Sequence, residues 1–145
     1  MNKGPWPLSW TQFLAALGVA PTAGPAPAFV TGAAYDSRAV KPGDAFFALR
    51  GVEADGARYA AQAKENGAAV VVAEAPTGID VAEVVVGEAR KALAEAAVAL
   101  YKDPSKRLTL IGLTGTNGKT TGAFLCRAIL LEAGIGEPSS LYGRP

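Results

Sequence analysis

The 145-residue sequence contains no histidine and only one cysteine, and its basic and acidic residues nearly cancel. Without histidine, neither acid–base chemistry nor a metal site can use an imidazole of this chain. The single cysteine, Cys126, excludes a disulfide framework within the chain. A formal net charge of +1 provides no electrostatic footprint for nucleic acid or for an anionic membrane. We therefore expect neither nucleic acid nor a membrane surface among the partners.

Long hydrophobic runs are also missing, although half of the residues are hydrophobic. No stretch approaches the roughly 20 consecutive apolar residues that a membrane-spanning helix needs. Pro5 and Pro7 interrupt the segment where a secretory signal needs a continuous apolar core. We expect a soluble, cytoplasmic protein that works in a reducing compartment.

The most specific motif is LTLIGLTGTNGKTT at residues 108–121. It predicts a short buried strand, a glycine-rich turn, and a helix that continues through Leu130. The backbone N–H groups of such a turn point inward, and the N-terminus of the following helix adds its unpaired N–H groups and positive dipole. The motif therefore predicts a P-loop that holds a nucleoside triphosphate.

The P-loop assigns roles to particular residues. Lys119 can reach the terminal phosphates and is the candidate catalytic residue, and the Thr120 hydroxyl is placed to bind Mg²⁺. The expected ATP-binding residues are Gly115, Thr116, Asn117, Gly118, Lys119, Thr120 and Thr121. The general pattern has a glycine six residues before the lysine, where this chain has Leu113. The alternative is a glycine-rich connection that binds nothing.

The preceding residues alternate strand and helix patterns, which predicts an α/β domain. The expected helices are 9–17, opened by a capping box at Ser9 and Gln12, 57–65 and 88–101. The expected strands are 29–37, 45–49, 68–72 and 84–86. The last two strands carry no polar residue, which indicates burial on both faces.

A linker follows the last of these helices. Residues 102–107 place a proline between charged residues, which interrupts the helical pattern. We predict a first domain at 1–103, a linker at 104–107 and the beginning of a second domain at 108–145. One strand and one helix cannot bury their own apolar faces. The second domain is therefore expected to be incomplete, and self-association through it is possible.

Five segments together resemble the Mur ligase family, and most closely the N-terminal portion of its UDP-N-acetylmuramoyl-tripeptide synthetases. They are Tyr-Asp-Ser-Arg at 35–38, Lys-Pro-Gly-Asp at 41–44, the Gly-x-x-x-Asp-Gly loop at 51–56, Tyr-Lys-Asp-Pro-Ser-Lys-Arg-Leu at 101–108, and Gly-Thr-Asn-Gly-Lys-Thr-Thr at 115–121. The resemblance implies a small UDP-sugar-binding α/β domain, followed by the first strand, P-loop and helix of an ATPase domain.

The resemblance also implies a site for the uridine end of the substrate, at Tyr35, Ser37, Val52, Glu53 and Ala54. A strand-end hydroxyl beside a glycine-bounded loop can hydrogen-bond a uracil edge and a ribose, and a tyrosine can support the ring. Family members often carry histidine or asparagine where this chain has Val52. A side-chain hydrogen bond there is lost or replaced by a backbone group.

The implied activity is ATP-dependent amide-bond formation with ATP and Mg²⁺ as cofactors. UDP-N-acetylmuramoyl-L-alanyl-D-glutamate would be activated as an acyl phosphate and then joined to a diamino acid, whose identity the sequence leaves open. The other magnesium ligands, the adenine pocket and the amino-acid site have no counterpart in these 145 residues. The chain alone is therefore not expected to ligate.

Other interpretations stay open. The ligase of the next step shares the Asp-Ser-Arg and Asp-Gly features but tends toward a Gly-Ser-x-Gly-Lys turn. Folylpolyglutamate synthetases have a similar turn without the preceding domain. A fragment or paralogue that binds nucleotide without catalysis, and a small kinase, are further alternatives. Asp36 and Arg38 alone would pass as a surface ion pair.

Overall fold

The computed structural model describes residues 5–20, 23–51, 55–107 and 111–135. The chain divides into two compact units, Met1–Arg107 and Leu108–Pro145, which are treated separately below. The first unit contains β1 (Leu8–Ser9), α1 (Trp10–Leu17), β2 (Phe29–Val30), β3 (Ala33–Ala34), η1 (Ser37–Ala39), β4 (Ala45–Phe47), η2 (Gly56–Tyr59), α2 (Ala60–Glu65), β5 (Val70–Ala73), β6 (Ala82–Val85), α3 (Ala89–Leu100) and η3 (Pro104–Arg107). The second contains α4 (Lys119–Glu132).

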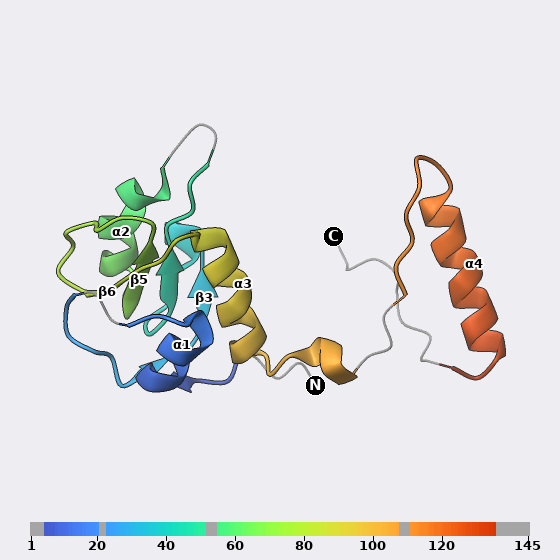
Figure 1. Ribbon diagram of the computed structural model, residues 1–145, viewed down its shortest axis with the longest axis horizontal. Helices are drawn as coiled ribbons and strands as arrows, with labels where there is room; N and C mark the ends of the chain where they lie inside the picture. The colour runs from blue at the N-terminus through green and yellow to red at the C-terminus, as the bar shows by residue number, and fades with distance from the viewer. Residues whose placement is uncertain (1–4, 21–22, 52–54, 108–110, 136–145) are drawn as a thin grey trace. The chain divides into compact units, whose positions relative to one another are not determined.

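The centre of the first unit is a four-stranded parallel sheet in the order β3-β4-β5-β6 (Figure 1). Ala34 pairs with Phe46, Phe46 with Val71, and Val71 with Glu83. Helix α2 connects β4 to β5, as a parallel connection requires. The expected α/β class is confirmed for this unit.

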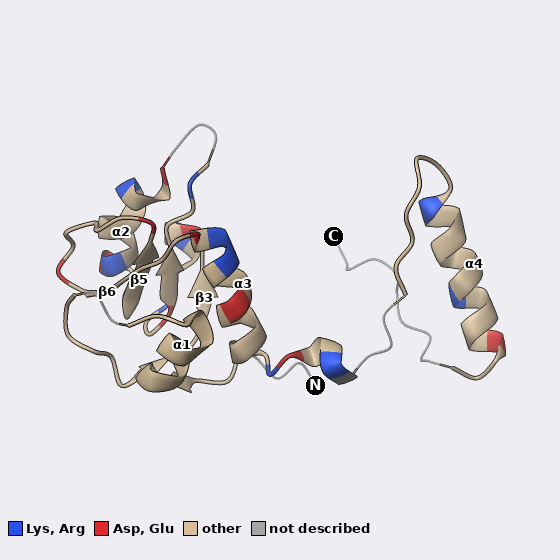
Figure 2. Cartoon of the chain, in the orientation of Figure 1, with Lys and Arg blue, Asp and Glu red and all other residues tan. Residues whose placement is uncertain are grey.

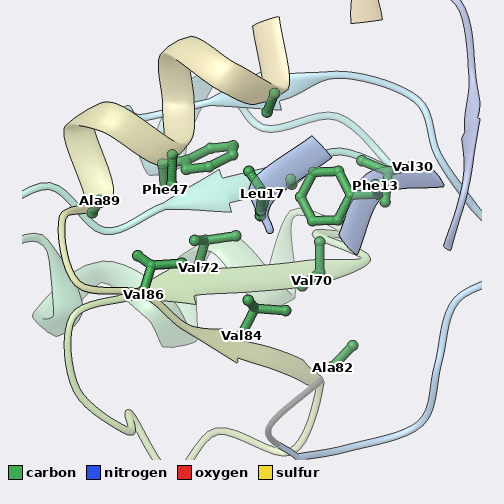
Figure 3. Close-up of a cluster of buried hydrophobic side chains, with 13 residues drawn as sticks. Phe13, Leu17, Val30, Phe47, Val70, Val72, Ala82, Val84, Val86 and Ala89 are labelled. Atoms are coloured by element: carbon green, nitrogen blue, oxygen red, sulfur yellow. The ribbon is translucent and has the colours of Figure 1, made fainter. Parts of the chain in front are cut away.

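Helices cover both faces of the sheet. Successive strand residues point to opposite faces, so Phe46 and Val71 pack with α2, whereas Phe47 and Val72 pack with α1 and α3. Figure 3 shows the second cluster, where Phe13 of α1 meets Phe47 with ring centroids 6.5 Å apart. All four residues of β5 are buried, which confirms the expected burial on both faces.

One predicted strand is divided in two. The expected strand 29–37 is β2, which pairs with β1, and β3, which pairs with β4. The chain changes partner at Gly32, where a Cβ atom would lie 2.4 Å from Asp44 Oδ1. The Asp44 carboxylate accepts hydrogen bonds from the Thr31 hydroxyl and the Lys41 N–H, at 3.3 and 3.0 Å. This long-range contact breaks the strand, and local propensity does not reveal it.

The helix predictions are largely confirmed. The capping box of α1 is present, with the Gln12 N–H donating to Ser9 Oγ at 3.3 Å. The expected helix 57–65 begins as the 3-10 turn η2 and becomes α-helical at Ala60. Strand β6 begins at Ala82, earlier than expected, and therefore includes the buried Glu83. The Glu83 carboxylate accepts hydrogen bonds from the Thr77 N–H at 2.5 Å and from the Thr77 hydroxyl at 2.6 Å. These two hydrogen bonds compensate for the burial of the carboxylate.

In the second unit, the prediction of a buried strand is wrong for the residues that the structure describes. Residues 108–110 lie outside the described residues, and 111–113 are exposed with no regular secondary structure. A strand requires a hydrogen-bonded neighbour, and the described part of this unit offers only the helix α4. The apolar side chains Leu125 and Ile129 of α4 are likewise exposed.

Candidate functional site

The Asp-Ser-Arg turn follows the carboxyl end of β3, the edge at which open parallel sheets bind ligands. Asp36 caps the turn η1 by accepting from the Arg38 N–H at 3.0 Å. The Arg38 guanidinium donates two further hydrogen bonds to this carboxylate, from Nε at 3.0 Å and from Nη2 at 2.7 Å. Asp36 and Arg38 therefore neutralise each other and shape the turn around Ser37.

Gln62 of helix α2 and Asn66 at its C-cap hydrogen-bond the turn at Ser37. Ser37 is only 5% exposed, and its hydroxyl donates to Gln62 Oε1 at 2.5 Å. The Asn66 side-chain amide donates to the Ser37 carbonyl at 2.8 Å. The sequence analysis does not identify Gln62 and Asn66 as site residues. Their spacing of four residues, which places both on one helix face, is the signal that could have indicated them. A ligand that bonds the Ser37 hydroxyl must share it with Gln62.

A pocket of about 440 Å³ opens beside the turn, lined by Tyr35, Asp36, Ser37, Arg38, Tyr59 and Gln62. This volume lies within the range of small-molecule sites, roughly 300–1,000 Å³. Tyr35 and Tyr59 are 68% and 42% exposed, so both rings can offer a flat face to a ligand. The structure thus brings Tyr35 and Ser37 together. Val52, Glu53 and Ala54 lie outside the described residues.

The structure explains why the neighbouring loop ends in Asp55 and Gly56. Asp55 Oδ1 accepts from the Ala57 N–H at 3.0 Å and so begins the turn η2. Gly56 lies against the segment that follows β4, where a Cβ atom would be 2.6 Å from the Leu49 carbonyl oxygen. This close approach excludes other residues at position 56 and leads the chain directly to Tyr59 and the pocket.

The P-loop residues form a turn at the beginning of α4. Gly118 is the N-cap of this 14-residue helix and provides no capping side chain, so the first N–H groups remain open to an anion. The Lys119 ammonium donates to the carbonyls of Gly115 and Thr116, the latter at 3.3 Å. Lys119 is the first residue of α4, whose first turn contains no acidic residue. Figure 2 shows blue, basic colouring at one end of α4. The turn is thus complementary to a phosphate chain.

Thr120 is the candidate magnesium ligand of the second unit. Thr120 lies in the first turn of α4 and is exposed, so its hydroxyl can meet an ion held by phosphates. Among the described residues there is no group of three or more histidine, cysteine, aspartate or glutamate side chains that could hold a metal. Mg²⁺ keeps several water and phosphate ligands when few protein groups are present. Thr120 fits the role of one ligand in such a site.

The Asp36–Arg38 pair makes a testable pH prediction. The hydrogen bonds from Arg38 lower the pKa of Asp36 from 3.8 to about 2. A carboxyl whose pKa is lower in the folded state stabilises the fold above its unfolded pKa, and this contribution is lost as the pH falls through the folded value. The pair should therefore remain intact at pH 4 and be lost near pH 2. NMR titration of the carboxyl carbon measures this, and Arg38→Met should return the pKa toward 3.8. An unchanged pKa in Arg38→Met would assign the shift to another group.

The chain matches the Mur ligase family, catalytic domain, over residues 29–114, which is more than half of its length. It belongs to the Mur ligase family. It is 45% identical over 114 residues to the UDP-N-acetylmuramoyl-L-alanyl-D-glutamate–2,6-diaminopimelate ligase of Aquifex aeolicus, covering 79% of this chain and 23% of that relative. The chain therefore spans about a quarter of the length of this curated relative.

Solved structures of the family resemble the chain as well. The UDP-N-acetylmuramoylalanyl-D-glutamyl-2,6-diaminopimelate–D-alanyl-D-alanyl ligase of Acinetobacter baumannii matches with a TM-score of 0.71 at 30% identity, over 91% of this chain and 30% of that one. The MurF ligase of Thermotoga maritima in complex with ADP matches with a TM-score of 0.56 at 28% identity, over 71% and 24%. Within the described residues, no helix is both long and apolar enough to cross a membrane.

Proposed function

We propose that this chain is the uridine-binding and P-loop portion of an ATP-dependent ligase of peptidoglycan precursor synthesis. The observation that carries the proposal is the P-loop turn at the open N-terminus of α4, in a chain of the Mur ligase family. The ligase would join a diamino acid to UDP-N-acetylmuramoyl-L-alanyl-D-glutamate. The similarity to the 2,6-diaminopimelate ligase of Aquifex aeolicus supports 2,6-diaminopimelate as that amino acid.

The proposed reaction has two steps. A D-glutamate carboxylate attacks the γ-phosphorus of ATP, which forms an acyl phosphate and releases ADP. The amine of the diamino acid then attacks the acyl carbon, so the C–O bond to phosphate breaks and an amide forms with loss of a proton. ADP leaves in the first step and phosphate in the second, and a Mg²⁺ ion bound in part by Thr120 would offset the phosphate charge. The task of this chain is to stabilise charge on the transferring phosphoryl group, through Lys119 and the first N–H groups of α4.

In the first domain, we propose that Tyr35 supports the uracil ring, and that Ser37 with residues 52–54 hydrogen-bonds the uridine. The pocket between Tyr35 and Tyr59 supports this assignment, because it offers two ring faces beside polar groups. Gln62 adds an amide to the same pocket.

The ligase of the next step is the competing substrate assignment. The Acinetobacter ligase, whose name specifies D-alanyl-D-alanyl, matches at 30% identity, and its TM-score compares backbone shape alone. The Aquifex relative matches at 45% identity, which is a comparison of side chains. The residues expected to select the amino acid have no counterpart in this chain, so the support for the diamino acid is the higher sequence identity to the Aquifex relative.

A ligation assay on the whole protein tests the proposal. We expect ADP release only when UDP-N-acetylmuramoyl-L-alanyl-D-glutamate and 2,6-diaminopimelate are both present. L-Lysine replaces diaminopimelate in one control, and UDP-tripeptide with D-alanyl-D-alanine replaces both substrates in another. Turnover confined to the latter pair would refute the assignment in favour of the next-step ligase.

The 145-residue chain alone should show no turnover. Its described residues include no acidic cluster for Mg²⁺, and residues 111–113 are not held in a sheet that would fix the P-loop. Steady ADP release by this chain with both substrates would mean that the active site is more compact than proposed.

A further inference from the structure

Helix α3 ends in a Schellman motif that has a lysine where glycine is usual. The Asp103 N–H donates to the Val98 carbonyl at 2.8 Å, and the Lys102 N–H donates to the Ala99 carbonyl at 3.2 Å. The motif needs a left-handed residue directly after the helix, and Lys102 takes that conformation with a φ of 56°. A Cβ atom disfavours the left-handed region, so glycine would fit this position with less strain. The local backbone therefore gives no reason for a lysine here.

The side chain of Lys102 has a partner in the N-terminal segment. Its ammonium lies over the ring of Trp6, 4.6 Å from the ring centroid, which is a cation–π contact. The Trp6 N–H also donates to the Leu100 carbonyl at 2.8 Å. Leu100 belongs to the last turn of α3, whose carbonyls have no partner within the helix. Trp6 thus holds both the end of α3 and the second residue after it, and we call Trp6, Leu100 and Lys102 the helix-end clamp.

The residues that follow the helix-end clamp have little backbone freedom of their own. Asp103 has a φ of 43° and is the second consecutive non-glycine residue in the left-handed region. Its carboxylate accepts a hydrogen bond from the Ser105 hydroxyl. Pro104 comes between them, and its ring fixes its φ. The turn η3 then ends the first unit at Arg107. The clamp therefore holds the first of several restrained residues through which the chain leaves α3.

We infer that Trp6 and Lys102 are positioning residues for ligation, because the helix-end clamp restricts the directions in which the chain leaves the first unit. The inference rests on the proposed function, in which the first unit binds the UDP-linked substrate and the P-loop holds ATP. The substrate carboxylate and the γ-phosphate must then meet. Each direction that is excluded beforehand lowers the entropy lost at that meeting. Neither Trp6 nor Lys102 contacts a reacting group in this assignment.

The backbone order of the linker tests the clamp in the 145-residue chain. Order parameters from ¹⁵N relaxation at the amides of 105–107 should lie near 0.85, about the value of rigid backbone, and should fall toward about 0.6 in Trp6→Ala. Lys102→Met removes the charge and should lower them as well, whereas Lys102→Arg should retain the wild-type values. Lys91→Met is the matched control, since Lys91 is an exposed lysine of α3 that pairs with Glu95.

Lys102→Gly separates positioning from stability. Glycine is the preferred residue of the motif, so the urea midpoint of the first unit should stay at or above the wild-type value. This variant still loses the contact with Trp6, so the order of the linker should fall as in Lys102→Met.

In the whole protein, turnover of UDP-N-acetylmuramoyl-L-alanyl-D-glutamate with ATP and 2,6-diaminopimelate should fall about two- to fivefold in Lys102→Met and in Lys102→Gly. This is the fold-change that corresponds to an exposed cation–π contact. Uridine affinity should be unchanged, because neither Trp6 nor Lys102 lines the proposed uridine pocket.

Wild-type linker order and turnover in both Lys102→Met and Lys102→Gly would overturn the inference. A loss of turnover that only follows a lower urea midpoint, with linker order unchanged, would overturn it too, since the clamp would then serve the fold alone. A Lys102→Arg variant as disordered as Lys102→Met would exclude the charge as the cause. Failure of the wild-type whole protein to ligate would instead refute the proposed function and the positioning role with it, while the order parameters would still decide whether the clamp restrains the linker.

Discussion

Replacing Lys119 by alanine in the whole protein should lower the turnover number about a hundredfold, by comparison with the loss of a single donor to a developing anion, roughly 3 kcal/mol. Lys119 is the basic residue of the P-loop, and its ammonium now rests on the carbonyls of Gly115 and Thr116. With a bound nucleotide it would turn to the phosphates. The N–H groups of α4 remain in the variant, so some ATP binding should survive.

Turnover and nucleotide affinity must be measured separately in this experiment. The expected signature is a large fall in the turnover number with uridine affinity unchanged, because the proposed uridine pocket is lined only by residues of the first unit. Lys106→Ala is the control, since Lys106 is an exposed lysine paired with Asp103 before the P-loop. If Lys119→Ala turned over at the wild-type rate, Lys119 would have no catalytic role.

Replacing Phe47 by alanine should reduce the free energy of unfolding of the first unit by about 3–5 kcal/mol, the usual loss for a buried phenylalanine. Phe47 is fully buried in the central strand β4, and its ring faces that of Phe13. Alanine would remove these contacts and leave a cavity between the sheet and helix α1. Urea denaturation followed by tryptophan fluorescence measures the loss, because Trp10 stacks on Phe13 at 5.9 Å.

Total stabilities of roughly 5–15 kcal/mol mean that Phe47→Ala can be substantially unfolded in water. Phe47→Leu keeps most of the volume and should cost less, which keeps the transition measurable. Phe29→Ala is the matched control, since Phe29 is 58% exposed at the start of β2 and should change the stability little. Equal losses in Phe47→Ala and Phe29→Ala would contradict the assigned core.

The local geometry of the candidate site was predictable where it depends on adjacent sequence. The P-loop is such a case, because the anion site needs only a glycine turn, a lysine and the first turn of a helix. Gln62 and Asn66 were not predictable in the same way. They meet Ser37 across 25 and 29 residues of sequence, and the contact exists only once α2 has packed on the sheet.

By itself the sequence determined the helix α1 with its capping box, the buried parallel strand β5, and the open N-terminus of α4, because each depends on residues within a few positions of one another. The tertiary structure alone decided where the strand 29–37 breaks and where the pocket beside the Asp-Ser-Arg turn forms. The break depends on Asp44 meeting Gly32, and the pocket on Gln62 of α2 meeting Ser37. Contacts between distant segments create both features, and no local propensity encodes such contacts.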